Sequence, residues 1–405
     1  MSASHAGPAP PHAPWVLVLA ATFGMQVAIM IVTQAVPVIA PLLTAEVGLA
    51  PETIGYLTGT AHLGTAVYLL VGGPLILRLG PVRMLQIGAA AAVCGSLLAT
   101  SGLVALLFLG ALVLGLGYGP TIPAGSRILA RAVPPEHRTL IFSVKQAGTP
   151  LGGILAAVAL PPVAIVFGWR VALLLAALIV LGSIAAVQPI RAGLDTDRDR
   201  GRRIGLRALL PLSVLGATFA AVQGCFTAFM VTLLTTAHDY TLPEAGIVFA
   251  CLLAGGFAGR IVLAWIADRT GAAIAILLLM LGTAGVAGAG FALLAGAAAL
   301  PVVALLAAVV GATGTACAGI ILAEFARLAP ADRLAEATAG FSLLAFLIFF
   351  VAPAVFAFVV RLSGDWTLPV LIVSAQAVVT AVLLAPRLLR EARAAASRDA
   401  SLPNP

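Results

Sequence analysis

Two cationic side chains lie inside long apolar stretches of this 405-residue sequence. Lys145 is seven residues beyond Arg138, and Arg260 is eight residues before Asp268. If these stretches are helices, each cation lies about 10–12 Å from the same end of its bundle. No Asp or Glu is expected at that depth. An anion between the two cations would relieve their repulsion, because Arg grips a carboxylate with two parallel hydrogen bonds and Lys adds a point charge.

Each cation also has a less specific interpretation. The long side chain of Lys145 could extend to lipid headgroups. Arg260 could bond to carbonyls at a helix end or pair with Asp268, although eight residues correspond to an offset of about 80° around a helix. Both alternatives stay open at this level.

Polar residues in the same apolar stretches could complete an anion site. Gln26 and Gln223 occupy nearly equivalent positions in the two halves of the chain, which raises the expectation that they face a central cavity. Polar side chains in such helices commonly bond between helices instead. The predicted substrate-binding residues are Arg260, Lys145, Gln146, Gln26, Gln223 and Tyr118.

His62 lies about nine residues into an apolar stretch and is the proton-coupling candidate. Histidine is the side chain that most readily titrates near neutral pH. A neutral, packed histidine is the alternative. Glu324 is interpreted as a local ion pair with Arg327, three residues on. The first apolar stretch carries no buried Asp or Glu, which argues against a cationic substrate.

The elements that must position these residues are membrane-spanning helices. Apolar residues make up 61% of the chain and charged residues only 9%, against about 25% in soluble domains. This composition excludes soluble, disordered and disulfide-rich classes. Charge-poor runs of spanning length predict twelve helices, two of them in each of the longest runs: 12–46, 52–78, 83–127 (two), 146–169, 171–190, 208–237, 245–267, 270–323 (two), 337–360 and 366–386.

The distribution of basic residues predicts the topology. With the N-terminus placed in the cytoplasm, all but four of the 22 Lys and Arg residues fall in cytoplasmic segments or the tail. Positive residues concentrate on the cytoplasmic side, so both termini are expected there. The net charge of +7 then reflects contact with anionic lipid headgroups, and nucleic acid is not implied. No nucleotide-binding loop and no cluster of metal ligands occurs, so no cofactor is expected.

The chain divides into two similar halves. Residues 189–207 form a charged, Arg-rich segment between a six-helix bundle at 1–188 and another at 208–388, with a cytoplasmic tail at 389–405. Leu-Arg-Leu-Gly at 77–80 is echoed by Asp-Arg-Thr-Gly at 268–271, and the segment 129–134 is echoed at 325–330. Duplicated six-helix units are the architecture of many secondary transporters.

These loops resemble the motif G-x-x-x-D-R/K-x-G-x-R-R/K of the major facilitator superfamily, and the resemblance covers nearly the whole chain. The first copy has Leu77 at the acidic position, whereas the second keeps the acid but has Ala264 for its first Gly. The resemblance implies a conformational latch at Arg78, Gly80, Arg83, Asp268, Arg269 and Gly271. It implies that the second copy carries more of the ionic contact.

A narrower resemblance concerns the substrate. Residues 143–153 and the pair Gly259-Arg260 are similar to bacterial cyanate-permease-type carriers. Arg260 also resembles the arginine that contacts the substrate carboxylate in oxalate and monocarboxylate carriers. The glycines of 148–153 partly resemble the motif of drug/proton antiporters.

The sequence therefore predicts an all-α, multi-pass secondary transporter of the bacterial inner membrane. It would move a small organic or inorganic anion by alternating access as a monomer, with proton symport as one coupling mode. The alternative is a drug or metabolite efflux antiporter of the same superfamily. A sensor or an intramembrane enzyme is disfavoured, because no added soluble domain and no His/Asp/Glu cluster at membrane depth is predicted.

Overall fold

The computed structural model describes residues 14–134, 138–191, 210–328 and 334–399, and these residues form helices without any strand. The first half contains α1 (Trp15–Val47), α2 (Thr53–Val71), α3 (Gly73–Leu79), α4 (Pro81–Ala99), α5 (Val104–Tyr118), α6 (Thr121–Ala132), α7 (Arg138–Phe167), α8 (Trp169–Val187) and the short 3-10 helix η2 (Gln188–Ile190). The second half contains α9 (Leu210–Ala237), α10 (Leu242–Thr270), α11 (Ala273–Leu294), α12 (Leu300–Gly314), α13 (Ala318–Leu328), α14 (Leu334–Ser363) and α15 (Thr367–Asp399).

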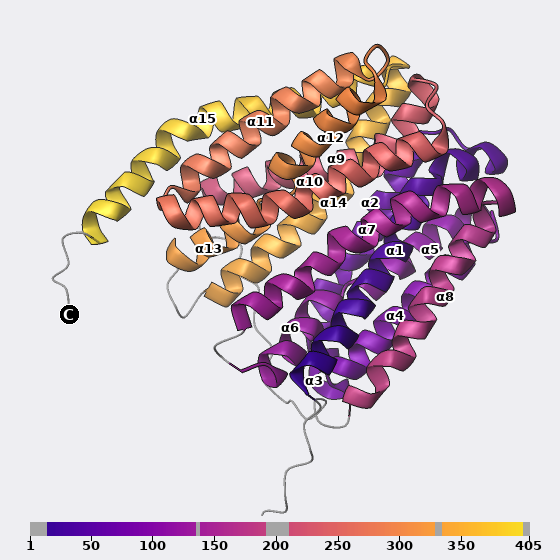
Figure 1. The fold of residues 1–405 in the computed structure, drawn as a ribbon, viewed down its shortest axis with the longest axis horizontal. Coiled ribbons are helices and arrows are strands. Elements are labelled where there is room, and N and C mark those ends of the chain that lie inside the picture. The colour runs from indigo at the N-terminus through magenta and orange to yellow at the C-terminus, as the bar shows by residue number, and fades with distance from the viewer. Residues whose placement is uncertain (1–13, 135–137, 192–209, 329–333, 400–405) are drawn as a thin grey trace, which may run out of the picture.

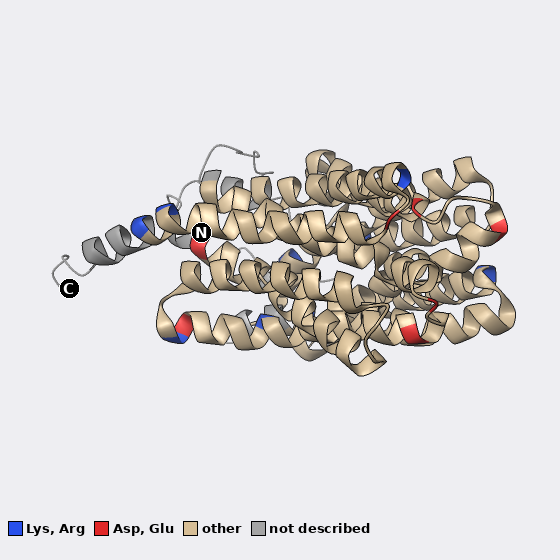
Figure 2. Cartoon of the chain, turned by 90° about the horizontal axis from the view of Figure 1, so that it is seen from above, with Lys and Arg blue, Asp and Glu red and all other residues tan. Residues whose placement is uncertain are grey.

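Twelve helical segments in this part of the chain are long and apolar enough to cross a membrane, which confirms the predicted fold class. The first double-length run turns between α4 and α5, where Gly102 adopts a positive φ of 74°. Asp, Glu, Lys and Arg gather mostly toward the two ends of the helices, and the middle is largely free of charge (Figure 2). The chain is therefore a multi-pass membrane protein. The cytoplasmic placement of its termini stays a prediction.

The helices form two bundles that lie side by side, α1–α8 in one and α9–α15 in the other (Figure 1). The start of α1 and the end of α15 lie at one end of the molecule, which we call the terminal end. The opposite end, which we call the loop end, carries the connection between α1 and α2 and its counterparts. Figure 1 shows the bundles converging toward the loop end and spreading toward the terminal end.

Glycines let the backbones of the two halves meet in the part nearer the loop end. A methyl group at Gly59 of α2 would lie 2.8 Å from the carbonyl oxygen of Phe350 in α14. One at Gly246 of α10 would collide with the carbonyl of Ala157 in α7. Small residues are what permit such close helix packing in a membrane. The contact between the halves therefore depends on the absence of side chains at these positions.

A polar tie fastens the first bundle at the loop end. Glu46, near the end of α1, accepts a hydrogen bond from the indole Nε1 of Trp169 at 2.8 Å and forms an ion pair with Arg170. The Nε of Arg170 in turn donates to the carbonyl of Thr100, just after α4, at 3.0 Å. These contacts join α1, α4 and α8, so they hold three helices of one half together without touching the other half.

Candidate functional site

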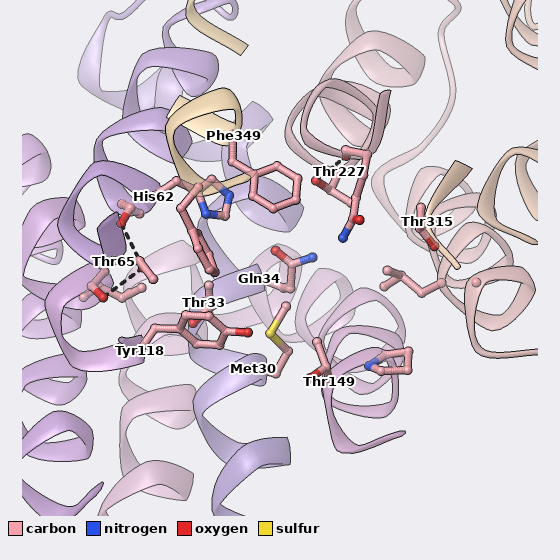
Figure 3. Close-up of a pocket in the computed structure, with 18 of the residues that line it drawn as sticks. Met30, Thr33, Gln34, His62, Thr65, Tyr118, Thr149, Thr227, Thr315 and Phe349 are labelled. Atoms are coloured by element: carbon pink, nitrogen blue, oxygen red, sulfur yellow. Dashed lines mark hydrogen bonds between the residues drawn. The ribbon is translucent and has the colours of Figure 1, made fainter. Parts of the chain in front are cut away.

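A cavity of about 110 Å³ lies between the two bundles. About 10–15 Å³ of such volume holds one water, so the cavity has room for a small molecule. Helices α1, α2, α5 and α7 of the first half line it together with α9, α10 and α14 of the second. Figure 3 shows Gln34 near its middle, with His62, Phe349 and Tyr118 on one side and Thr315 and Thr149 on another.

Arg260 of α10 lines this cavity, as the sequence predicts, and is half-buried. Its Nη2 donates one long hydrogen bond of 3.4 Å to the carbonyl of Thr315. Its buried Nε has no hydrogen-bond partner among the described residues. No described Asp or Glu pairs with it. A guanidinium carries five N–H donors, so most of its capacity is unused and an anion is the natural complement.

Lys145 of α7 is buried but does not line the cavity. Its Nζ donates a 2.9 Å hydrogen bond to the carbonyl of Thr121, at the break where α5 ends at Tyr118 and α6 begins. A methyl group at Gly125 would lie 2.9 Å from this ammonium, so the glycine provides its space. Lys145 is therefore not part of the cavity lining to which Arg260 belongs, and a backbone carbonyl accepts a hydrogen bond from its ammonium. Its predicted role in substrate binding stays a prediction.

Of the other predicted substrate-binding residues, two line the cavity and two do not. Gln223 of α9 and Tyr118 of α5 line the cavity from opposite halves. Gln26 is buried behind the lining, and its Nε2 donates to the hydroxyl of Thr149 at 3.1 Å. Gln146 is exposed and lies outside the cavity lining. A helical residue directly after a buried one points about 100° away from it, so Gln146 turns outward as Lys145 turns inward.

His62 also lines the cavity, as part of an aromatic cluster. Its ring centroid lies 5.0 Å from that of Phe349 and 6.0 Å from that of Phe346. Its imidazole makes no hydrogen bond with a residue that the structure describes. Toward the terminal end, Phe346 packs with Ala66 and Leu343 in a small apolar layer.

Sequence reasoning did not assign Gln34, Phe346 or Phe349 to the site. Gln34 was recognisable as a polar residue in the first apolar stretch, and it lies eight residues after Gln26. The two phenylalanines stand in the run Phe-Leu-Ile-Phe-Phe at 346–350, where an apolar residue in an apolar helix carries no signal.

The predicted latch residues lie at the terminal end. Gly80 joins α3 to α4 with a φ of 87°, and Gly271 ends α10 in the left-handed conformation. The guanidinium of Arg269 lies 4.9 Å from the ring centroid of Trp265. Asp268 is exposed and forms no ion pair within the described chain. The latch role of these residues, with exposed Arg78 and Arg83, stays a prediction.

These features define a class of protein: a twelve-helix membrane protein whose two six-helix halves enclose a central cavity lined by both apolar and polar residues. Residues 17–323 match the Major Facilitator Superfamily, and the chain belongs to that family. This confirms the resemblance found in the sequence.

Comparison with individual proteins adds two curated relatives. The chain is 26% identical over 156 residues to a hexuronate transporter of Bacillus subtilis, covering 38% of this chain and 36% of that protein. It is 30% identical over 261 residues to a gentisate transporter of Corynebacterium glutamicum, covering 56% of each. The matches thus span roughly a third to just over half of these relatives. Both are named as transporters and not as enzymes.

Solved structures share the fold over nearly the whole chain. A peptide transporter of the POT type in complex with sulfate superposes with a TM-score of 0.78 at 17% identity, covering 93% of this chain and 95% of that one. A POT family transporter in complex with 5-aminolevulinic acid gives a TM-score of 0.76 at 13% identity, covering 91% and 95%. At such low identity the likeness concerns the fold alone.

Proposed function

We propose that this protein is a secondary transporter that moves a small organic anion, with its carboxylate bound by Arg260. One observation carries the proposal: a guanidinium with unused donors lines a cavity between two bundles of a duplicated membrane fold. An unpaired charge in a membrane interior costs several kcal/mol, and a bound carboxylate would remove that cost. The two curated relatives named above transport hexuronate and gentisate, which are both organic anions.

The proposed cycle is alternating access at a site shared by both halves. The bundles converge at the loop end and spread at the terminal end (Figure 1), which is the arrangement of a carrier facing the terminal side. Gln223 and Arg260 of the second half and Gln34 and Tyr118 of the first would contact one ligand. Neutralising Arg260 by binding would favour closing around the ligand, because closing the empty cavity would leave an unpaired cation in a dry environment. One chain forms the complete cavity, so we propose a monomer.

Proton coupling is the part of the proposal assigned to His62. It lines the same cavity as Arg260 and is the residue type suited to gaining and losing a proton in transport. A co-transported proton would offset the charge of the anion. We place this cycle in the bacterial inner membrane, with the terminal end in the cytoplasm, on the basis of the basic residues alone.

The test is ligand-dependent thermal stabilisation of the purified full chain, followed by uptake into proteoliposomes, with benzoate, galacturonate, sulfate and a quaternary ammonium compound. A ligand at 100 times its Kd stabilises the folded state by about 2.7 kcal/mol. We expect Arg260→Gln to weaken carboxylate binding about 30-fold or more, since truncating a buried charged partner costs about 2–5 kcal/mol.

Arg361→Gln is the matched control, because Arg361 lies in the last turn of α14 at the loop end, away from the cavity. It should leave binding unchanged. Binding and uptake of the ammonium compound alone, unaffected by Arg260→Gln, would refute the anion proposal and favour drug efflux.

A further inference from the structure

One side of the cavity is an aromatic wall formed by His62, Tyr118, Phe346 and Phe349. The centroids of Phe346 and Phe349 are 5.7 Å apart, and those of Tyr118 and Phe346 are 6.3 Å apart. His62 lies 5.0 Å from Phe349. The wall draws on α2 and α5 from one half and α14 from the other. Phe346 is tilted by 61° to Tyr118 and by 67° to Phe349, so a ligand ring could meet the face of one ring and the edge of another, which are the favoured geometries of aromatic pairs.

Most hydroxyl groups that line the cavity are already engaged as donors. Four of the five lining threonines donate to a backbone carbonyl at 2.7–3.0 Å: Thr33 to Ile29, Thr65 to Gly115, Thr227 to Gln223 and Thr315 to Gly311. The fifth, Thr149, accepts from Gln26. A hydroxyl has a single hydrogen to donate, so the four offer a ligand only acceptor capacity and a methyl group.

The hydrogen-bond donors that remain free lie in four side chains of the lining. They are the guanidinium of Arg260, the carboxamides of Gln34 and Gln223, and the imidazole of His62 in the aromatic wall, none of which makes a short side-chain hydrogen bond within the described chain. This set suits one carboxylate and one or two further polar atoms. A sugar acid with a hydroxyl on nearly every carbon would turn several of them against the aromatic wall, where each would lose its water without gaining a partner.

We propose that the ligand of this cavity is a flat aromatic or unsaturated monocarboxylate with few hydroxyl groups, and not a polyhydroxylated acid. The inference rests on the proposed function, since it assumes that Arg260 holds the carboxylate. The ring of the ligand then lies against Phe346 and Phe349, and the glutamine side chains bind its remaining polar atoms. The aromatic wall selects for ring shape, whereas Arg260 selects for charge.

Three acids that share one carboxylate and a six-membered ring test this selection. The Kd of the purified full chain is measured by calorimetry for benzoate, cyclohexanecarboxylate and galacturonate. We expect benzoate to bind about 2- to 10-fold tighter than cyclohexanecarboxylate, which is the range of an aromatic pair interaction. Galacturonate should bind at least about 10-fold more weakly than benzoate, because its hydroxyls would be left unpaired.

Variants of α14 assign the selection to the wall. Phe349→Leu keeps an apolar side chain but removes the ring, and should abolish the preference for benzoate over cyclohexanecarboxylate. Phe358→Leu is the matched control, because Phe358 lies on the same helix with 54% of its surface exposed, away from the cavity. It should leave the preference intact. The wild-type series alone keeps the proposal testable if Phe349→Leu fails to fold.

The outcomes separate this inference from the function on which it rests. Galacturonate binding that is as tight as benzoate binding, and is lost in Arg260→Gln, would overturn the aromatic-acid proposal and leave the anion carrier standing. A benzoate preference that survives in Phe349→Leu would also overturn the role of the wall. The absence of Arg260-dependent binding for all three acids would overturn both proposals.

Discussion

Replacing Gly59 by Ala should bias the protein away from the conformation described here. Gly59 of α2 faces the carbonyl of Phe350 in α14, and a methyl group would lie 2.8 Å from that oxygen. Backbone atoms of two packed helices must then separate. Overpacking of this kind costs about 1–3 kcal/mol. The cost applies only while the halves touch near the loop end, so a conformation that opens this end escapes it.

The expected size of the effect follows from that difference. A change of about 1–3 kcal/mol between two conformations alters their ratio about 5- to 150-fold. Gly95→Ala is the matched control: a methyl at Gly95 of α4 would lie 2.5 Å from the carbonyl of Gly110 in α5, within one bundle. It strains both conformations alike, so it should lower stability without changing their ratio.

Accessibility of the cavity from the loop side measures the ratio. Met30 lines the cavity (Figure 3), and Met30→Cys introduces a thiol there after the four native cysteines (94, 225, 251 and 317) are replaced. The labelling rate with a membrane-impermeant maleimide is measured in oriented vesicles. Gly59→Ala should raise the rate from the loop side at least about fivefold, and Gly95→Ala should not. Equal labelling in both variants would refute the argument that this contact sets the equilibrium.

Three further perturbations test separate features. Lys145→Met should weaken benzoate binding, measured by calorimetry, by less than about tenfold, or 1.4 kcal/mol. The reason is that the ammonium of Lys145 bonds to the carbonyl of Thr121 and lies outside the cavity lining. A loss as large as that of Arg260→Gln would instead support a site formed by both cations. Glu46→Gln should lower the thermal unfolding temperature only slightly, as expected for an exposed ion pair, since the two side chains of its pair with Arg170 are 42% and 53% exposed. Gly80→Ala should cost about 1–3 kcal/mol in the same unfolding assay, because φ is 87° and ψ is 154° there.

Two controls make the stability measurements specific. Glu52→Gln removes a charge near the loop end that forms no ion pair with a described residue. Gly73→Ala adds a methyl where no atom lies within 4 Å and the backbone is not strained. Either control losing as much stability as its partner variant would contradict the assigned cause.

The fold and the position of Arg260 in the candidate site were predictable from sequence for the same reason. Spanning helices require long charge-poor runs, and a charge inside such a run stands out, as Arg260 does. The position of Lys145 was not predictable, because its partner is a carbonyl that the break after Tyr118 makes available. Depth in the membrane can be counted along a helix. The identity of a neighbouring backbone atom depends on how two other helices meet.

The aromatic wall was not predictable from the sequence for a different reason. Phe346 and Phe349 lie in an apolar run in which lipid-facing and cavity-facing positions use the same residue types. Phe358, farther along the helix, is 54% exposed instead. Only the packing of α14 against α2 distinguishes these positions. A polar residue in a membrane helix indicates that its side chain faces other protein groups or a cavity, whereas an apolar residue can face either lipid or protein.

The tie formed by Glu46, Trp169, Arg170 and Thr100 has a consequence for biosynthesis. All four residues precede residue 189, so the tie can close while the ribosome is still making the second half. Domains generally fold as units, N-terminal first, during synthesis. The first bundle can then fold before the second bundle has been synthesised, and the second bundle packs against it afterwards. Two halves expressed as separate polypeptides should therefore be able to reassemble into a working carrier.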